Sequence, residues 1–319
     1  MPPFPKPRFD YSYDVTAETR ALRRYRDTKP GRAIPAKANG SLLLATWNIA
    51  NLGVQDRLDT DYRLMAEIIG WFDLVAVQEV NDNLRGIEAI HDHLPARYQL
   101  LFSDASGNQE RQAFLFDGTK VSRLREIGRL SIPPSSTKQI KVPGTTTDFP
   151  GFDRGPYLGS FESGAFRFLL ANVHLFFGSP QKADMERRIQ ETYAVAWWAN
   201  KRRTDPNTYV PDTIPLGDFN LPKAVKGDPI YDALTRRGLE IPAHTSQIGS
   251  AIASDSHFDQ IAFFPGDTKD RFTGQMNVFD FDGALFADLY AQRGIQPYLS
   301  YARYHISDHR PLWAEFSTG

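Results

Sequence analysis

The stretch Pro215-Leu216-Gly217-Asp218-Phe219-Asn220 guides the interpretation of the whole chain. A short apolar run ends at Gly217 and is followed by Asp218 and Asn220, two residues apart. Residues i and i+2 of an extended chain point to the same face, so a carboxylate and a carboxamide should project together, with Phe219 turned into packing. Such a pair can hold a water molecule, a hard cation or a phosphate oxygen. A simple polar turn is the alternative, and the rest of the chain bears on that choice.

The composition is that of an ordinary globular protein. The chain has 319 residues, no cysteine, and 37 basic against 38 acidic side chains. Net charge therefore gives no argument for a polyanionic partner, although local patches can still provide one. The absence of cysteine excludes disulfides and thiolate metal sites and is compatible with a reducing compartment. No run is apolar enough to span a membrane or to serve as a secretion signal, so we expect a cytoplasmic protein.

Residues 1–39 are expected to form an N-terminal arm that is partly helical, and residues 40–319 to form one catalytic domain. Segment 16–26 of the arm predicts a short helix that carries four arginines: Arg20, Arg23, Arg24 and Arg26. Such a helix can contact phosphates, but a solvated face is the commoner explanation. From residue 41 onward, apolar runs of strand length alternate with segments of helical spacing, which predicts an α/β domain.

Several local patterns predict individual elements. Residues 157–161 and 166–173 are expected to form a hairpin that turns at Ser163-Gly164, and residues 257–264 a strand. Segment 184–200 predicts an amphipathic helix whose apolar stripe belongs to the core. Segment 131–156 is rich in Ser, Thr, Pro and Gly, and is expected to be an excursion of the kind that shapes the mouth of a site.

Polar side chains recur where the apolar runs end. They are Asn48, Glu79, His174, Asp218, Asn220, Asp259, Asp308 and His309. Each one alone is more often a cap, a turn residue or an ordinary hydrogen-bonded side chain. It is improbable, however, that so many runs end in a carboxylate, an amide or an imidazole. Because strand ends converge on one edge of a sheet, we expect one acidic pocket over a rigid apolar base.

The residue types in this set suit a hard metal ion and a phosphate ester. Carboxylates together with amide oxygens favour Mg²⁺ or Mn²⁺ over zinc. A metal ion in such a pocket neutralises the charge of a bound phosphate ester. A histidine needs a carboxylate partner to fix its tautomer, and Asp259 and Glu110 are available for the two histidines. The sequence therefore contains the parts for metal-assisted attack of water at phosphorus.

Six motifs, in this order, resemble the endonuclease/exonuclease/phosphatase superfamily, which has the DNase I-like fold. The motifs are Trp47-Asn48, Gln78-Glu79, Asn172-Val173-His174, Gly217-Asp218-Phe219-Asn220, Phe258-Asp259-Gln260-Ile261 and Ser307-Asp308-His309. The resemblance covers about residues 41–317. It implies an α/β (α+β) fold, a four-layer α/β sandwich in which two mostly antiparallel β-sheets are flanked by helices.

The resemblance also implies roles for the site residues. Glu79 is the principal ligand of one or two Mg²⁺ (or Mn²⁺) ions, with Asn48 beside it and Asp308 as a further ligand or water orienter. His174 is similar to the histidine that helps to protonate the leaving oxygen. Glu110, in the segment 109–114, matches the glutamate that supports this histidine.

The remaining roles concern the attacking water and the phosphate. By the same resemblance His309, oriented by Asp259, acts as a base toward the water or contacts the scissile phosphate. Asp218 and Asn220 orient the nucleophile and the phosphate oxygens. Arg154 resembles a family arginine that lies near the phosphate.

The activity that this resemblance favours is Mg²⁺-dependent phosphodiester hydrolysis of nucleic acid by a DNase I-like endonuclease. The basic arm, Lys201–Arg203 and Arg236-Arg237 are the segments expected to meet a phosphate backbone. The alternative is hydrolysis of a smaller ester, such as a phosphoinositide or sphingomyelin-type headgroup, with Phe176-Phe177 as an apolar membrane-facing loop. A non-catalytic binding protein is least favoured, because none of the expected site residues is missing. No protein partner is predicted.

Two segments and one motif depart from the family pattern. Segments 131–156 and 266–305 match no subgroup of the superfamily. The lysine-bearing glutamate motif of the abasic-site endonucleases is absent near Glu79. A role in abasic-site repair is therefore not expected.

Overall fold

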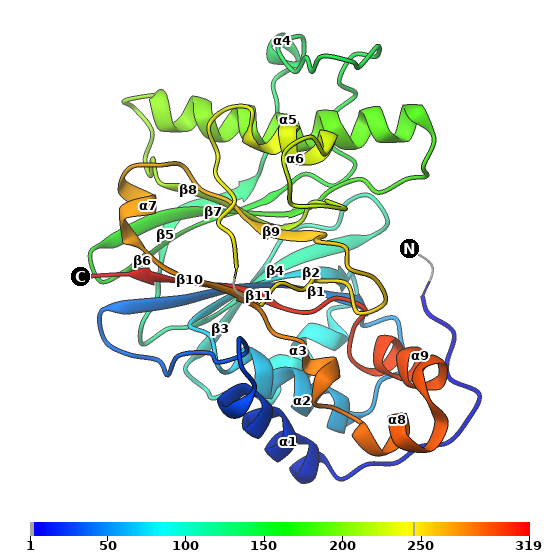
Figure 1. Ribbon diagram of the computed structural model, residues 1–319. Helices are drawn as coiled ribbons and strands as arrows, with labels where there is room; N and C mark the ends of the chain where they lie inside the picture. Colours follow the sequence, from blue (N-terminus) through cyan, green and yellow to red (C-terminus); the bar gives the residue numbers. More distant parts are fainter. Residues whose placement is uncertain (1–2, 245) are drawn as a thin grey trace.

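The computed structural model describes residues 3–244 and 246–319. Two β-sheets pack face to face, and helices cover the outer face of each sheet (Figure 1). This arrangement is the four-layer α/β sandwich expected from the sequence. The sheets and the helices that cover them place the polar side chains of the site between the two inner faces.

The first sheet has six strands and the second has five. In spatial order the six-stranded sheet contains β10 (Phe272–Val278), β11 (Leu312–Ser317), β1 (Ser41–Leu52), β2 (Leu74–Asn81), β4 (Glu110–Asp117) and β3 (Tyr98–Phe102). The five-stranded sheet contains β5 (Ser122–Arg129), β6 (Tyr157–Ser163), β7 (Phe166–His174), β8 (Thr213–Asp218) and β9 (Asp259–Ile261).

The helices of the described residues fall into two groups, one on each sheet (Figure 1). On the side of the six-stranded sheet are α1 (Val15–Thr28), α2 (Asp59–Ile69), α3 (Arg85–Asp92), the 3₁₀ helix Phe281–Gly283, α8 (Ala287–Arg293) and α9 (Ile295–His305). On the side of the five-stranded sheet are α5 (Lys182–Thr204) and α6 (Pro229–Thr235), with the short α4 (Pro134–Thr137) above them and α7 (Asp267–Arg271) near the sheet edge.

Both sheets are mostly antiparallel, as expected. The parallel pairs are β1 with β2 and β7 with β8, and the other pairings are antiparallel. A parallel connection needs a long crossover, and here α2 and α5 supply it. All five strands of the second sheet come from one continuous segment, residues 122–261, whereas the first sheet takes strands from both ends of the chain.

Alternation along each strand divides its side chains between the two faces. In β1, Leu42 and Leu44 belong to the core between the sheets, while Leu43 and Ala45 face the helices. The inter-sheet core is rich in aromatic rings, and Phe114 of the first sheet lies 5.3 Å from Phe161 of the second. Buried side chains of this size make the two sheets a rigid base for the site.

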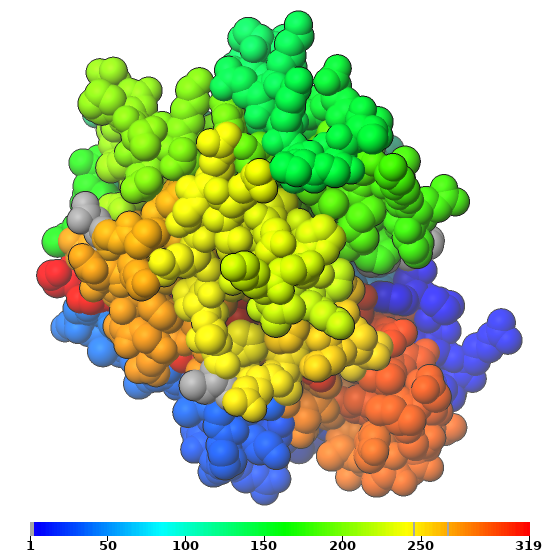
Figure 2. Space-filling view, turned by 45° about the horizontal axis from the view of Figure 1, so that its top comes forward, coloured from blue at the N-terminus to red at the C-terminus, as the bar shows by residue number. Residues whose placement is uncertain are grey.

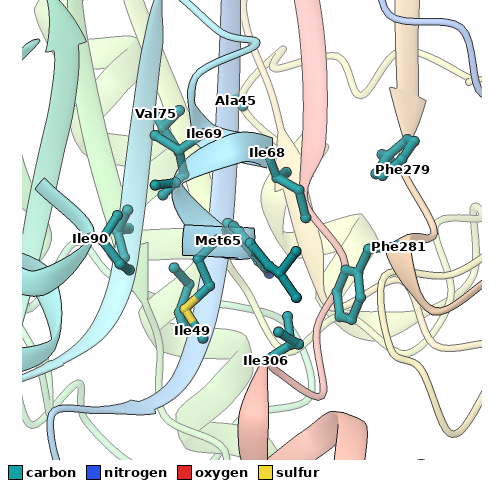
Figure 3. Close-up of a cluster of buried hydrophobic side chains, with 14 of the residues drawn as sticks. Ala45, Ile49, Met65, Ile68, Ile69, Val75, Ile90, Phe279, Phe281 and Ile306 are labelled. Atoms are coloured by element: carbon teal, nitrogen blue, oxygen red, sulfur yellow. The ribbon is translucent and has the colours of Figure 1, made fainter. Parts of the chain in front are cut away.

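The core under the helices of the first sheet is aliphatic at its centre (Figure 3). Met65, Ile68 and Ile69 of α2 pack on the outward side of β1 and β2, and Ile306 joins them from the segment after α9. The spacing of these α2 residues is the helical pattern seen in the sequence. Residues 266–305 thus supply a strand, a 3₁₀ helix and two helices that complete this layer.

The expected helix of the N-terminal arm is α1, and it packs against the domain. Leu22 is fully buried in the same core as α2. Arg23 forms a bidentate ion pair with Glu67 of α2, at 2.6 and 2.8 Å. Arg26 lies 4.8 Å from the Trp71 ring centroid. Two of the four arginines of this helix are therefore engaged with the helix layer of the six-stranded sheet.

Segment 131–156 differs from expectation, because its body covers α5 rather than forming the mouth of the site. Ile140 and Phe149 are buried against Trp197 of α5, and in Figure 1 the segment lies above that helix. The side chain of Glu186 on α5 accepts the Thr146 backbone N–H at 2.9 Å. Helix α5 is thus covered on both sides, and its apolar stripe is core as predicted. Only the end of the segment, at Arg154, reaches the site.

Three strand boundaries also differ from expectation. Asn48 does not end its strand, because β1 continues to Leu52, and Glu79 lies inside β2, which continues to Asn81. Both strands shift register at these positions, so the polar residues occupy irregular points within the strands. The strand that carries Asp259 is only three residues long, Asp259–Ile261, instead of the eight expected.

Candidate active site between the two sheets

Strand alternation places three of the expected residues on the inner faces. Asn48 follows Leu42 and Leu44 by even steps along β1, so its side chain faces the second sheet. His174 follows Leu170 on β7 in the same way, and Asp218 follows Leu216 on β8. All three side chains are buried. The period-2 pattern of the strands is therefore sufficient to bring these groups together.

Glu79 reaches the site only because β2 is irregular there. Val75 and Val77 face the helix layer, so alternation alone would send Glu79 to the same side. The register of β2 against β4 shifts between Val77 and Val80, and Glu79 has a φ of +59°, in the left-handed region. A non-glycine residue in this region is strained and is kept where the surrounding structure imposes it. The bulge turns the Glu79 carboxylate toward Asn48.

One amide side chain joins the two sheets at the centre of the site. Nδ2 of Asn48 donates to Oε1 of Glu79 at 3.1 Å and to Oδ2 of Asp218 at 3.0 Å. The second oxygen of Glu79 accepts the Asn51 backbone N–H at 2.8 Å. These bonds fix two carboxylates, one from each sheet, on either side of a single amide. They also leave Oδ1 of Asn48 buried without a hydrogen-bond donor among the described residues.

His174 lies against three carboxylates. Its Nδ1 is 2.9 Å from Oε2 of Glu110, while its Nε2 faces Glu79 at 3.8 Å and Asp218 at 3.9 Å. The expected pairing with Glu110 is therefore present, and Glu110 is the first residue of β4. Arg154 donates to the His174 carbonyl at 2.9 Å and lies 3.7 Å from Glu110. Arg154 therefore supports the pair of His174 and Glu110 and lies beside the site.

The second histidine has the expected carboxylate partner. Nδ1 of His309 is 2.7 Å from Oδ2 of Asp259, and both side chains are buried. Burial lowers the pKa of His309, but the carboxylates of Asp259 and Asp308 outweigh it and raise the pKa well above its ordinary value. The imidazole is therefore protonated near neutral pH. Such a group is suited to donate a hydrogen bond to a phosphate oxygen.

His305 lies at helical spacing from His309, but its side chain lies outside the site. His305 and His309 are four residues apart, a spacing that occurs in metal-binding helices. Here α9 ends at His305, and Nδ1 of His305 lies 2.7 Å from Oδ2 of Asp61 in the helix layer. The two histidines thus have separate carboxylate partners, and this pattern carries no metal site.

The loop after β8 is held by its own side chains. Asp218 accepts the Asn220 backbone N–H at 2.8 Å, and the Asn220 amide donates to the Leu175 carbonyl at 2.8 Å. Phe219 is buried on the opposite side, under α5 and α6, as predicted. Gly217 has a φ of +128°, and a Cβ there would lie 2.2 Å from the Val173 carbonyl oxygen, so only glycine fits.

Two residues of α5 support the site and were not found from the sequence. Glu191 is fully buried and accepts the backbone N–H of Asp153 at 2.9 Å and of Phe176 at 3.0 Å. It therefore ties the segment of Arg154 to the segment after His174. Arg188 donates to the Asn220 carbonyl at 2.5 Å. Charged residues at these spacings resemble a solvated helix face, so only the tertiary structure reveals their contacts.

A buried amide pair connects the sheets behind the site. Nε2 of Gln78 donates to Oδ1 of Asn172 at 2.7 Å. Nδ2 of Asn172 donates to the carbonyls of Val77 at 3.2 Å and Ala113 at 3.1 Å. These two carbonyls belong to the β2–β4 pairing next to the bulge. In the sequence, Gln78 and Asn172 stood out only as parts of motifs. The structure shows that their side chains join the two sheets by a hydrogen bond.

The oxygen atoms around Glu79 fit a hard cation. No cluster of three or more His, Cys, Asp or Glu side chains able to hold a metal is present among the described residues. Mg²⁺, however, is commonly held by one or two carboxylates with water and substrate phosphate. Oδ1 of Asn48 and Oδ1 of Asp308 are buried without hydrogen-bond partners in the described part of the chain. Burial and the nearby carboxylates of Glu79 and Asp218 raise the pKa of Asp308. A bound cation would offset this repulsion between carboxylates and favour the ionised form of Asp308.

The basic segments expected to meet phosphate all make contacts within the chain. Arg202 forms a bidentate pair with Glu126 at 2.8 Å. Lys201 lies over the Trp197 ring, and Arg237 donates to the Tyr193 hydroxyl at 2.8 Å. These contacts account for Arg202, Lys201 and Arg237 by local structure.

A cavity of about 680 Å³ opens beside the site, next to the strand of Asp259. Its walls are mainly apolar and come from the segments on both sides of α6 and before β9, including Pro222, Tyr231 and Ile241. Figure 2 views this face, on which the segment between β8 and β9 covers the surface in yellow. Burial, together with the neighbouring His257 and the cation of Arg32, lowers the pKa of His244 in this cavity to about 4. The cavity wall is therefore uncharged at this histidine near neutral pH.

The Glu110–His174 pair makes the stability of the fold depend on pH. Burial alone would raise the pKa of Glu110, but the His174 hydrogen bond and the charges of His174 and Arg154 lower it from 4.5 to about 2. The stability that ionised Glu110 contributes is therefore complete above about pH 4.5 and is lost as the pH falls toward 2. We expect Glu110→Gln to remove up to about 3 kcal/mol of this dependence.

The measurement is the free energy of unfolding by urea at several pH values between 2 and 6. The wild-type curve should fall more steeply than the variant curve over the range from 4.5 to 2. Parallel curves would show that Glu110 does not have a lowered pKa.

Among the described residues, no helix has the length and apolar character needed to cross a membrane. This finding agrees with the absence of a long apolar run in the sequence.

No protein-family model matches the chain. A curated deoxyribonuclease of Thioalkalivibrio sp. (strain K90mix) is 32% identical over 199 residues, which make up 59% of this chain and 49% of that protein. The chain thus spans about half the length of the curated relative that it matches.

Solved structures match over much more of the chain. D. rerio TDP2 in complex with a single-strand DNA product superposes with a TM-score of 0.57 at 15% identity, over 88% of this chain and 100% of that one. An endonuclease/exonuclease/phosphatase family protein of Bacteroides thetaiotaomicron gives 0.52 at 19% identity, over 86% and 94%. A mannosyl-6-phosphatase of the same organism gives 0.53 at 19%, over 86% and 99%. The chain therefore has the DNase I-like fold, and the fold implied by the resemblance in its sequence is confirmed.

Proposed function

We propose that this protein is a divalent-metal-dependent phosphodiesterase that hydrolyses nucleic acid. The observation that carries the proposal is the pairing of two buried histidines with carboxylates, His174 with Glu110 and His309 with Asp259. The carboxylate of Asp218 lies 3.9 Å from Nε2 of His174. Two histidine–carboxylate pairs beside a third carboxylate provide the acid and base groups that proton transfer requires when water attacks phosphorus.

In the proposed reaction Asp218 accepts a proton from the attacking water while the water oxygen bonds to phosphorus. The bond between phosphorus and the leaving oxygen breaks, and this oxygen takes a proton from Nε2 of His174. Glu110 holds the other ring nitrogen. His309, kept protonated by its carboxylate neighbours, donates a hydrogen bond to a non-bridging phosphate oxygen. Asp218 then loses its proton to solvent and His174 regains one, so one water is added across the bond.

Glu79, Asn48 and Asp308 are the residues that would hold Mg²⁺ or Mn²⁺ in this site. When bound, the ion supplies positive charge that stabilises the developing negative charge on the phosphate oxygens. The unpartnered oxygens of Asn48 and Asp308 support this assignment. Within the protein, the role of these three residues is to offer oxygen ligands on a rigid base.

Removal of divalent metal is expected to lower hydrolysis by at least about 100-fold, because the site concentrates carboxylates that would otherwise repel a phosphate. The experiment compares turnover after dialysis against EDTA with turnover after Mg²⁺ or Mn²⁺ is restored. Full activity in the chelator would remove the metal from the proposed mechanism.

Two names among the comparisons support nucleic acid as the substrate: the curated relative is a deoxyribonuclease, and one structural neighbour was solved with a single-strand DNA product. The alternative is a smaller phosphoester, since another neighbour is a mannosyl-6-phosphatase. The exposed ring of Phe177 leaves open a lipid headgroup as that ester. A non-catalytic role remains the least favoured, because both histidines have carboxylate partners and no residue expected from the resemblance is missing.

The first test is a turnover panel with wild type and Asp218→Asn. The substrates are plasmid DNA, single-stranded DNA, RNA, bis-p-nitrophenyl phosphate and a phosphoinositide, each with Mg²⁺. Hydrolysis of a nucleic acid that depends on Asp218 supports the proposal. Turnover of the phosphoinositide alone would keep the site and replace the substrate.

A further inference from the structure

A pair of aromatic rings lies beside the site and has no part in the reaction described above. We call the rings of Phe177 and Phe258 the aromatic shelf. The Phe258 ring centroid is 5.6 Å from that of His309, with 33° between the planes. The Phe177 ring meets Phe258 edge-on, at 6.4 Å and 80°. The shelf therefore begins at the imidazole that contacts phosphate in the proposed reaction and extends outward to solvent.

The outer ring of the shelf is exposed although it is large and apolar. Phe177 is 42% exposed, while Phe258 is half-buried. Phe177 follows His174 by only three residues, so it lies at the rim of the site. An aromatic side chain exposed at the rim of a polar site offers a face on which a flat ligand group can stack.

The segment that carries Phe177 is held firmly in place. The Arg188 guanidinium lies 5.0 Å from the Phe177 ring centroid and is itself bonded to the Asn220 carbonyl. The Phe176 backbone N–H donates to Glu191, and the Ser179 backbone N–H donates to Asp184 at 2.7 Å. Because the ring is already ordered, little conformational entropy remains to be lost when a ligand stacks on it.

We propose that the aromatic shelf stacks an unpaired nucleobase next to the phosphate that is hydrolysed, which makes single-stranded nucleic acid the preferred substrate. This inference rests on the proposed function. Every nucleobase has a π-face, so stacking on an aromatic ring binds single strands with little sequence preference. In a duplex the face of each base is covered by its neighbours, and unstacking it costs free energy.

The surroundings of Phe177 favour a base over a lipid surface. Loops that enter a membrane interface carry several apolar side chains together. Here Arg188 lies over the Phe177 ring, Arg187 lies over the ring of the adjacent Phe176, and the polar Ser179 follows in the sequence. Phe177 is the exposed ring of this group, and one exposed ring offers one stacking face, which is what a single nucleotide requires. Lipid binding is therefore the competing outcome in the test below.

The test measures binding by fluorescence anisotropy in EDTA, so that hydrolysis does not interfere. The probe is a labelled single-stranded deoxyoligonucleotide that is made intact, or with one abasic position moved along it. The proteins are wild type, Phe177→Ala, Phe177→Trp and the control Tyr209→Ala. Tyr209 is 47% exposed and carries Arg167 at 5.3 Å over its ring, but Arg167 lies at the end of β7 opposite His174.

We expect Phe177→Ala to weaken binding of the intact oligonucleotide about tenfold, while Phe177→Trp and Tyr209→Ala stay within about twofold. One abasic position should weaken wild type by a similar factor and should have no further effect on Phe177→Ala, because both changes remove the same contact. Additive losses, unchanged binding by Phe177→Ala, or no binding by wild type would overturn the shelf. The shelf would also be overturned if Phe177→Ala lost binding to anionic phospholipid vesicles but kept its binding to the oligonucleotide.

The outcome is independent of the catalytic proposal. If wild type hydrolyses no phosphodiester with Mg²⁺, the proposed reaction fails, whereas the anisotropy experiment still reports on the shelf. If hydrolysis is observed but binding ignores Phe177, the reaction stands and only the shelf is withdrawn.

Discussion

Asp218→Asn and His309→Gln should each lower the rate of phosphodiester hydrolysis by about 10³-fold or more, with the protein still folded. A positioned acid or base contributes about 10²–10⁴-fold to such a reaction, and a donor aimed at developing charge contributes a similar factor. Asparagine has nearly the shape of aspartate, and its one amide oxygen can still accept the Asn220 backbone N–H, while the bond from Nδ2 of Asn48 is lost. The change removes the proton acceptor while the architecture remains.

The control for this experiment is His305→Gln. His305 is buried like His309 and pairs with Asp61 at the same distance of 2.7 Å, but it lies in the helix layer. A general loss of stability from removing a buried histidine pair would affect both variants. We expect the control to retain a rate within a few fold of wild type. Turnover near the wild-type level in both site variants would show that the reaction occurs elsewhere.

Asn172→Ala is expected to destabilise the fold by about 3–5 kcal/mol. Its side chain satisfies the carbonyls of Val77 and Ala113 and accepts from Gln78, all in a buried position. Each buried polar group left without a partner costs about 1–3 kcal/mol. The substitution removes the side-chain donor from both carbonyls, and water has little access to them between the sheets, whereas Nε2 of Gln78 keeps its bond to the Thr46 hydroxyl at 2.9 Å.

Equilibrium unfolding in urea measures this effect. Asn207→Ala is the matched control, because Asn207 is exposed and bonds only to its neighbour Asp205. It should change stability by less than about 0.5 kcal/mol. Gln78→Ala and Asn172→Ala should be non-additive, since they remove one shared hydrogen bond. A loss below 1 kcal/mol in Asn172→Ala would mean that the inter-sheet amide pair contributes little.

The residues that could be located from the sequence are those that obey strand alternation. Asn48, His174 and Asp218 lie at even steps from apolar residues of the inter-sheet core, and this spacing can be read from the chain. Their pairing with one another needed the family resemblance, because sequence spacing does not tell which strands become neighbours. The partners Glu110 and Asp259 were found in the same way, from chemistry and resemblance together.

Other features were beyond the sequence for physical reasons. Alternation would send Glu79 away from the site, and only a bulge with a left-handed residue reverses it. Glu191 on α5 has the appearance of a surface charge, yet it is fully buried because segment 131–156 covers that helix. The segment was predicted to shape the site mouth because it is rich in Ser, Thr, Pro and Gly, a composition that does not reveal the burial of Ile140 and Phe149.

The hydrogen bonds of Asn48 to both Glu79 and Asp218 mean that the site exists only when the two layers are closed upon each other. One layer is built from the chain termini and the other from the continuous segment 122–261. A fragment with the first layer alone would hold the carboxylates of Glu79, Glu110 and Asp308 with His309, and the other fragment would hold Asp218 and Asp259 with His174. Two separately expressed fragments are therefore expected to be inactive until they assemble. The hydrolysis rate that they regain would then measure the amount of assembled protein. By the same geometry, a nascent chain completes its site only after β11 has joined the six-stranded sheet.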